Sequence, residues 1–115
     1  MTTLSIHRLS ADTGTSPQLS PADMEAVAAA GFRSVVNNRP DHEGGPGQPT
    51  SASIEAEAKA HGLAYAYLPV SPAVQSAEEA AALGHLLEAL PKPVLLFCRS
   101  GARSTRLYEL AQSQR

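Results

Sequence analysis

A single cysteine, Cys98, lies between a short apolar run and a polar segment that contains two arginines. Residues 93–97 read Pro-Val-Leu-Leu-Phe, and residues 98–103 read Cys-Arg-Ser-Gly-Ala-Arg. The apolar run is too short and too continuous for an amphipathic helix, so it predicts a buried strand, whereas residues 104–114 predict a helix. This order places Cys98 at the carboxyl end of a strand, where open α/β sheets bind their ligands.

The segment that follows the cysteine is suited to binding an anion. Its backbone N–H groups have no partners within the predicted helix, and the positive end of the helix dipole lies beside them. A thiol in this position ionises below its ordinary pKa of about 8.5, and the thiolate is the nucleophilic form. The predicted nucleophile and its charged partner are Cys98 and Arg103, and the predicted anion-binding residues here are Arg99, Ser100, Gly101, Ala102 and Ser104.

The alternative interpretation of Cys98 is an inert core thiol, because free cysteine is among the most commonly buried residue types. The flanking Arg99 and Arg103 argue against it, since an inert core position would exclude charged residues. Gly101 also argues against it, because glycine permits an unusual backbone angle and the close approach of a ligand. We therefore expect Cys98 to be catalytic.

Composition limits the class of protein. The chain has 115 residues, and we expect residues 1–115 to form one domain whose core needs neither disulfides nor metal. A formal net charge of −2 offers no basic surface for nucleic acid or an anionic membrane. No apolar run approaches the ~20 residues of a membrane span, and the first residues lack the pattern of a secretory signal. With one unpaired cysteine, these features predict a cytoplasmic protein.

Predicted strands and helices alternate along the chain. The expected strands are residues 4–9, 32–37, 63–70 and 93–97, and the expected helices are residues 18–30, 51–61, 76–90 and 104–114. Ser20 and Ser76 are the predicted N-caps of two of these helices. This order predicts an α/β fold with a mostly parallel sheet of four to five strands, covered by helices on both faces.

The loop from residue 38 to residue 50 carries the densest polar cluster outside the cysteine segment. It follows a strand expected to end near Cys98, and Arg39 is a candidate anion-binding residue. A structural ion pair between Arg39 and Asp41 is the alternative. No metal site is predicted at Asp41, His42 and Glu43, because no second histidine lies at a ligand spacing, and no cofactor is implied.

Three motifs together resemble a known family. They are Asn-Arg-Pro-Asp at residues 38–41, Pro-Gly-Gln-Pro at residues 46–49 and Cys-Arg-Ser-Gly at residues 98–101. Over nearly the whole chain, the sequence resembles the beta-lactamase-hydrolase-like family of phosphatase-like domains, also described as a sulfurtransferase family. The resemblance implies a fold similar to that of the dual-specificity protein phosphatases. It also implies an association with sulfide-oxidising and persulfide enzymes, sometimes as a fused domain.

The spacing between the cysteine and the arginine separates two chemistries. Cysteine phosphatases use Cys-x5-Arg, whereas this chain has Cys98-x4-Arg103, a shorter arc that resembles the loop of rhodanese-like sulfurtransferases. Phe97 stands where phosphatases usually have histidine. Residues 69–72 lack the aspartate with which dual-specificity phosphatases protonate the leaving group, and Asp41 is the candidate substitute.

We therefore expect a cysteine-dependent enzyme. The favoured reaction is sulfur transfer from a small sulfur donor to a thiol or cyanide through a Cys98 persulfide, in company with a sulfide-oxidation or persulfide enzyme. The first alternative is hydrolysis of phosphomonoesters through a phosphocysteine, with Asp41 as the acid. The second alternative is a module that binds an anion or a partner with little catalysis.

Overall fold

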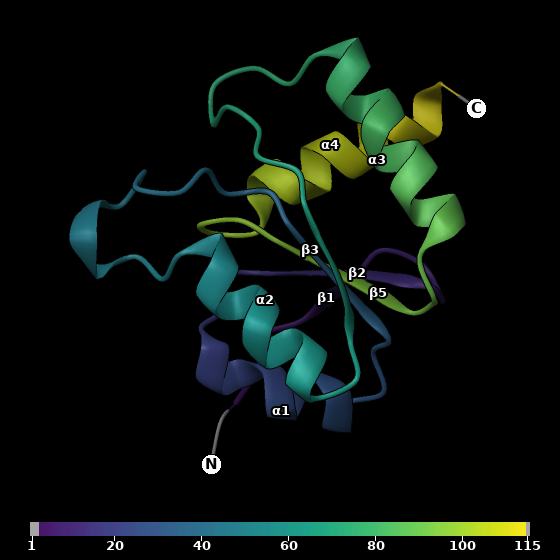
Figure 1. Ribbon diagram of the computed structural model, residues 1–115. Coiled ribbons are helices and arrows are strands. Elements are labelled where there is room, and N and C mark those ends of the chain that lie inside the picture. Colours follow the sequence, from purple (N-terminus) through teal and green to yellow (C-terminus); the bar gives the residue numbers. More distant parts are fainter. Residues whose placement is uncertain (1–2, 115) are drawn as a thin grey trace.

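Five short strands form one sheet in the computed structural model, which describes residues 3–114 (Figure 1). The strands are β1 (His7–Arg8), β2 (Thr13–Ser16), β3 (Ser34–Asn37), β4 (Ala64–Tyr67) and β5 (Val94–Phe97). They lie in the order β1-β2-β5-β3-β4, and every neighbouring pair is parallel except β1 with β2. The predicted mostly parallel sheet is confirmed.

Four α-helices and two short 3-10 helices connect the strands. They are η1 (Pro21–Asp23), α1 (Met24–Ala29), η2 (Gly45–Gly47), α2 (Ser51–Ala60), α3 (Ala77–Ala89) and α4 (Ala102–Ser113). At the start of α3, the Glu79 N–H donates to Ser76 Oγ over 3.0 Å, so Ser76 is the N-cap that the sequence predicts. Within residues 3–114, no helix is long and apolar enough to cross a membrane.

The helices cover both faces of the sheet, as predicted. Helices α1 and α2 lie on one face and α3 and α4 on the other (Figure 1). The side chains of adjacent strand residues point to opposite faces of the sheet. Leu95 therefore packs against α1 and α2, and Leu96 packs against α3 and α4. This double burial explains why the strand before Cys98 reads as a continuous apolar run.

Strand β2 is the element that the sequence prediction missed. Its residues read Thr-Gly-Thr-Ser, all are buried, and the strand lies between β1 and β5. A strand is recognised in a sequence by its apolar residues, and this segment has none. Its extended conformation follows from its pairing with the strands on either side. Space favours glycine at position 14, because a Cβ there would lie 3.2 Å from Ile6 Cγ2 and 3.4 Å from the His7 carbonyl oxygen.

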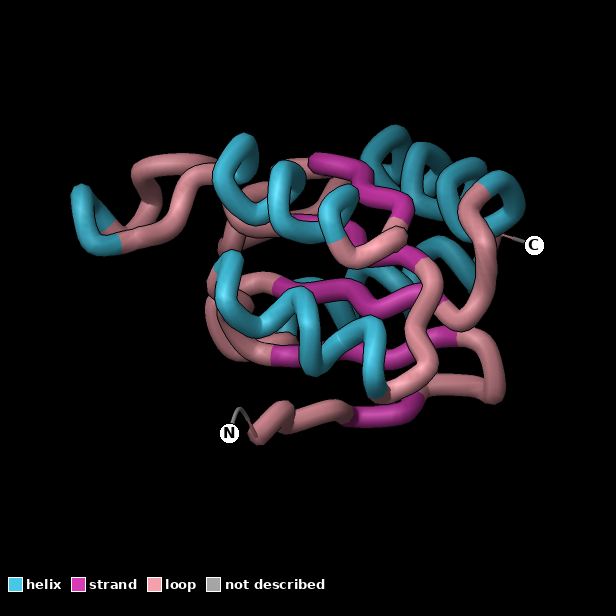
Figure 2. The backbone as a smooth tube through the Cα atoms, turned by 60° about the horizontal axis from the view of Figure 1, so that its bottom comes forward, coloured by secondary structure: helices cyan, strands magenta, loops and turns pink. Residues whose placement is uncertain are grey.

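The central strands end in register at one edge of the sheet. Phe97 of β5 lies opposite Ser16 of β2 on one side and Asn37 of β3 on the other. The Asn38 N–H donates to the Phe97 carbonyl oxygen over 2.8 Å. This bond holds the ends of β3 and β5 side by side. The residues that follow β2, β3 and β5 therefore meet at this edge. Figure 2 shows the loop that contains η2 projecting from the fold.

The buried ring of Phe97 generates a prediction about stability. Phe97 is fully enclosed and belongs to the apolar core cluster that contains Leu19, Met24 and Val35, so an imidazole there would lose its hydration. We expect Phe97→His to lower the free energy of unfolding by about 2 kcal/mol or more, measured by urea denaturation. The control is Val74→His, at a side chain that is 74% exposed. Equal unfolding midpoints for the two variants would contradict the prediction.

Candidate active site

The Cys98 thiol follows β5 directly and is enclosed by the loop that it begins. Cys98 is 1% exposed, and the Gly101 N–H donates to its Sγ over 3.0 Å. Gly101 is the N-cap of α4 and has a left-handed φ of 95°. A Cβ at Gly101 would lie in ordinary contact with the Ser16 carbonyl oxygen, at 3.4 Å, so the backbone angle is what favours glycine here. The chain can therefore turn around the sulfur.

Hydrogen bonds favour the thiolate form of Cys98. Burial raises the pKa of the thiol, but donors from the Ser104 backbone and hydroxyl and from the Gly101 and Ser100 backbone outweigh burial, so the pKa is lowered. The Ser104 hydroxyl also donates to Asn38 Oδ1 over 2.8 Å, so its single proton is shared between two acceptors. The predicted activated cysteine is consistent with this arrangement.

Arg103 lies in the first turn of α4, and its guanidinium has some N–H groups that are hydrogen-bonded and others that are not. Its Nη1 donates to Glu43 Oε2 over 3.0 Å and to the Val70 carbonyl over 3.2 Å, and its Nη2 donates to Glu43 Oε1 over 3.0 Å. Nε is buried and has no hydrogen-bond partner among residues 3–114. A guanidinium has five N–H donors, so Nε–H and one Nη2–H form a free edge. An unsatisfied buried donor costs about 1–3 kcal/mol, which a bound anion would recover.

Glu43 is shared by two arginines. Besides its two bonds from Arg103, its Oε1 accepts from Arg39 Nε over 2.9 Å. The Arg103 hydrogen bond is the largest influence on the pKa of Glu43, and with Arg39 it outweighs burial, so the pKa is lowered. Glu43 therefore stays ionised at neutral pH.

Gln18 links Arg39 back to the cysteine loop. Arg39 Nη1 donates to Gln18 Oε1 over 3.1 Å, and the Gln18 N–H donates to the Arg99 carbonyl oxygen over 3.1 Å. With Glu43 and Arg103, these bonds join the segments after β2, β3 and β5 in one network. The network connects the Arg103 side chain to the backbone of Arg99, the residue after Cys98.

A pocket of about 510 Å³ opens between the charged side chains. Its lining residues are Arg39, Glu43, Gly44, Pro72, Arg99 and Arg103. Three guanidinium groups and one carboxylate leave two positive charges in excess, and the Arg99 side chain has no ion pair or hydrogen bond within residues 3–114. The charge arrangement suits an oxyanion, and Cys98 is not itself among the lining residues.

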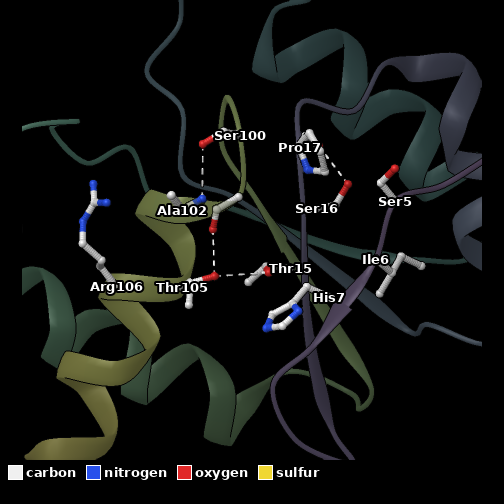
Figure 3. Close-up of a pocket in the computed structure, with 11 residues that line it drawn as sticks. Ser5, Ile6, His7, Thr15, Ser16, Pro17, Ser100, Ala102, Thr105 and Arg106 are labelled. Carbon is white, nitrogen blue, oxygen red and sulfur yellow. Dashed lines mark hydrogen bonds between the residues drawn. The ribbon is translucent and has the colours of Figure 1, made fainter.

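A second cavity lies against the outer side of the same loop (Figure 3). It encloses about 650 Å³ between β1, β2 and the start of α4, and Cys98 and Arg103 do not line it. The Thr105 hydroxyl donates to the Gly101 carbonyl oxygen over 2.8 Å and lies 3.3 Å from Thr15 Oγ1. These bonds support the loop from outside, away from the thiol.

The structure brings most of the predicted site residues together. One end of the sheet carries Cys98, Arg103, Arg99 and Arg39. The thiol of Cys98 accepts hydrogen bonds from the backbone N–H groups of Ser100, Gly101 and Ser104. Ala102 is the exception within the loop, because its N–H donates to Ser100 Oγ over 3.3 Å and it is not among the groups that lower the pKa of the thiol.

Asp41 has a different environment from the other predicted residues. Its Oδ1 accepts from the Ser51 N–H at the start of α2 over 2.8 Å, and its own N–H donates to Tyr67 Oη over 2.7 Å. It does not line the arginine pocket, and its role as an acid stays a prediction. Among residues 3–114, Arg39 forms its ion pair with Glu43, not with Asp41.

Glu43 and Gln18 are the site residues that sequence reasoning did not identify. The four-residue spacing of Arg39 and Glu43 is the available signal for the first, and Gln18 depends on the missed strand β2. In residues 3–114, no three His, Cys, Asp or Glu side chains are grouped to hold a metal ion.

A cysteine at the end of a central strand, an arginine in the following helix and helices on both faces of a parallel sheet define a cysteine-phosphatase-like domain. Residues 5–115 match the family described as "Beta-lactamase hydrolase-like protein, phosphatase-like domain". The chain belongs to this family.

Curated relatives agree with the family assignment. A beta-lactamase hydrolase-like protein of Agrobacterium fabrum is 38% identical over 93 residues, and one of Xylella fastidiosa strain Temecula1 is 35% identical over 85 residues. These matches cover 80% and 74% of this chain. They cover only 21% and 20% of the relatives, so the chain spans about a fifth of their length.

Solved structures share the fold. A protein of Neisseria meningitidis z2491, described as a candidate phosphatase, is 31% identical with a TM-score of 0.83, over 90% of this chain and 72% of that one. The active form of Tk-PTP is 20% identical with a TM-score of 0.69, over 94% and 80% of the two chains. P. aeruginosa TpbA (C132S) in complex with pTyr is 16% identical with a TM-score of 0.65, over 89% and 58%.

The hydrogen bonds to the thiol generate a second prediction. Removing the Ser104 hydroxyl removes one of the donors that lower the pKa of Cys98. We expect Ser104→Ala to raise this pKa, so that the pH profile of Cys98 alkylation by neutral iodoacetamide moves to higher pH. Ser113→Ala, near the other end of α4, is the control. An unchanged profile in Ser104→Ala would show that the hydroxyl proton serves Asn38 alone.

Proposed function

We propose that this domain is a cysteine-dependent phosphatase that hydrolyses phosphomonoesters through a covalent phosphocysteine on Cys98. The observation that carries the proposal is the free Nε and Nη2 edge of Arg103, in the first turn of the helix that follows a buried thiol whose pKa is lowered. A phosphoryl group can accept hydrogen bonds from this edge and from loop backbone N–H groups. Membership of a phosphatase-like family and the fold shared with protein tyrosine phosphatases support the same class of reaction.

The proposed reaction has two displacements. The Cys98 thiolate attacks phosphorus and the bond to the leaving oxygen breaks, so the alkoxide or phenoxide departs and takes up a proton. Water then attacks the phosphocysteine, the sulfur–phosphorus bond breaks, and inorganic phosphate leaves as the thiolate is restored. Arg103 and the loop N–H groups stabilise the charge on the phosphoryl oxygens in both steps.

Among residues 3–114, the lining of the arginine pocket supplies no carboxylic acid ready to protonate the leaving oxygen. Glu43 is the carboxylate among its lining residues, and two arginines keep it ionised. Asp41 accepts a helix N–H away from the pocket lining. We therefore propose that the best substrates are esters whose leaving groups depart without help, such as aryl phosphates.

Sulfur transfer is the second candidate, and two observations favour it. The arc from Cys98 to Arg103 is one residue shorter than Cys-x5-Arg, and Glu43 is ionised instead of serving as an acid. With thiosulfate, the Cys98 thiolate would attack the outer sulfur, the S–S bond would break and sulfite would leave. An acceptor thiolate would then take the outer sulfur of the persulfide. A partner enzyme of sulfide oxidation or persulfide chemistry belongs to this candidate.

The experiment that separates the candidates measures both reactions on one preparation. The phosphatase proposal expects p-nitrophenyl phosphate hydrolysis and a phosphorylated Cys98 in the mass spectrum of rapidly quenched protein. Sulfur transfer expects, after thiosulfate treatment, an added mass of one sulfur atom on Cys98. Thiocyanate formation from thiosulfate and cyanide without hydrolysis would overturn the phosphatase proposal.

Replacing the nucleophile gives a third prediction. We expect Cys98→Ser to abolish turnover while the unfolding midpoint stays close to that of the wild type, because a serine hydroxyl without a base is a weak nucleophile. Arg103→Lys should also lower kcat/KM strongly, since an ammonium cannot replace a planar two-pronged donor. Steady-state kinetics and circular dichroism check both variants. Substantial turnover in Cys98→Ser would place the chemistry elsewhere.

The missing acid gives a fourth prediction. We expect kcat/KM for an alkyl phosphate to be lower than for p-nitrophenyl phosphate by about 10²-fold or more, because no positioned acid protonates the alkoxide. Asp41→Asn should change the aryl phosphate rate little. A large loss in Asp41→Asn that is confined to the alkyl phosphate would show that Asp41 is the proton donor.

A further inference from the structure

We propose that Glu43 is a positioning residue, which together with Arg39 holds the Arg103 guanidinium so that its Nε edge stays free for the anion. The inference deepens the proposed function, because it assigns residues of the same site. It requires only that an anion approaches Cys98 beside Arg103, whichever reaction follows.

The geometry of the ion pair carries the first step. Glu43 places one carboxylate oxygen on each terminal nitrogen of Arg103, at 3.0 Å in both cases, and the Val70 carbonyl takes a further Nη1 proton. These contacts occupy the Nη1–Nη2 edge of a planar group and the second Nη1 proton, so the adjacent Nε–Nη2 edge cannot rotate without breaking them. The buried, unpartnered Nε lies on this adjacent edge.

The position of Glu43 is itself fixed from the other side. Arg39 donates from Nε to the same Oε1 that Arg103 Nη2 contacts, and its Nη1 is held by Gln18. The Arg39 side chain is only 11% exposed. Glu43 is therefore held between two arginines, one of which is anchored to the segment after β2.

Gly44 is explained by the same arrangement. Its φ of −95° is open to any residue, so the backbone does not require glycine there. A Cβ at Gly44 would lie 2.7 Å from Arg39 Nη2 and 3.1 Å from Gln48 Oε1. A side chain at this position would therefore displace the Arg39 guanidinium. Gly47, in the same loop, has nothing within 4 Å of such a Cβ.

A simple charge argument gives the opposite expectation for Glu43. If its carboxylate only lowered the positive potential of the pocket, or occupied Arg103 in place of the substrate, removing its charge would strengthen anion binding. A positioning role predicts that removal weakens anion binding despite the gain of positive charge. The two roles therefore differ in the sign of the effect.

The test compares two reagents that alkylate Cys98. Iodoacetate carries a carboxylate that can bind the Arg103 edge, whereas iodoacetamide is neutral, and the ratio of their rate constants measures the anion preference without requiring turnover. We expect Glu43→Gln to lower this ratio about tenfold, because a carboxamide cannot accept from both Arg103 nitrogens and the loss of a charge-assisted hydrogen bond has this magnitude. An unchanged or higher ratio would overturn the inference.

Matched variants remove the remaining ambiguity. Gly44→Ala adds no charge but displaces Arg39, and we expect it to lower the ratio, whereas Gly47→Ala in open space should not. Glu55→Gln breaks another four-residue ion pair, with Lys59, away from the site, and should also leave the ratio unchanged. Equal ratios in Gly44→Ala and Gly47→Ala would overturn the role of Arg39.

The same variants separate this inference from the proposed function. We expect the iodoacetate preference to fall in Glu43→Gln whether or not the wild type hydrolyses p-nitrophenyl phosphate. A wild type without hydrolysis but with this change would overturn the phosphatase proposal and support the positioning role. Where hydrolysis occurs, kcat/KM should fall in Glu43→Gln by up to about 10²-fold, as misplacement of a catalytic group predicts, with the circular dichroism spectrum unchanged.

Discussion

The two-pronged ion pair between Glu43 and Arg103 is the interaction on which the site depends. With the hydrogen bond from the Ser104 hydroxyl to Asn38, it is a direct side-chain link between the loop after β3 and the helix after β5, and it leaves one guanidinium edge free. A mostly buried guanidinium carries a large desolvation cost unless its donors are paired. Glu43 and the Val70 carbonyl supply that pairing without using the edge that an anion needs. The pair thus makes the burial of Arg103 compatible with ligand binding.

The sheet makes this pair possible. Parallel strands β2, β5 and β3 end in register, so three loops that are distant in sequence leave the fold within hydrogen-bonding distance of one another. Gln18 contacts the Arg99 carbonyl and Arg39, and Asn38 contacts the Phe97 carbonyl and the Ser104 hydroxyl. Each loop therefore stabilises its neighbour, and Cys98 lies where their hydrogen bonds converge. The regular core positions the site, and the polar network fixes its details.

Local sequence patterns predicted the features that depend on a few adjacent residues. The apolar run before Cys98, the N-cap at Ser76 and the left-handed Gly101 each have a local physical cause, and the α/β layering follows from their order. Strand β2 escaped prediction because its Thr-Gly-Thr-Ser sequence is polar and its pairing with β5 is non-local. The link between Glu43 and Arg103 spans sixty residues, so no local pattern shows it. The contact of Asp41 with the Ser51 N–H joins residues ten apart across an irregular loop, so no periodic pattern predicts it, and the catalytic role of Asp41 stays a prediction.

Proton supply is the physical property that separates the two reactions considered for this site. Both need a thiolate, and the backbone and hydroxyl donors around Cys98 favour it in either case. Only ester hydrolysis also releases an alkoxide, which needs a proton unless the leaving group is stable by itself. The carboxylate nearest to Arg103 cannot supply that proton without giving up the charge that pairs it with two arginines. If the domain hydrolyses phosphomonoesters as proposed, the pairing of Glu43 with two arginines would restrict that hydrolysis to stable leaving groups, and it would place no such restriction on sulfur transfer.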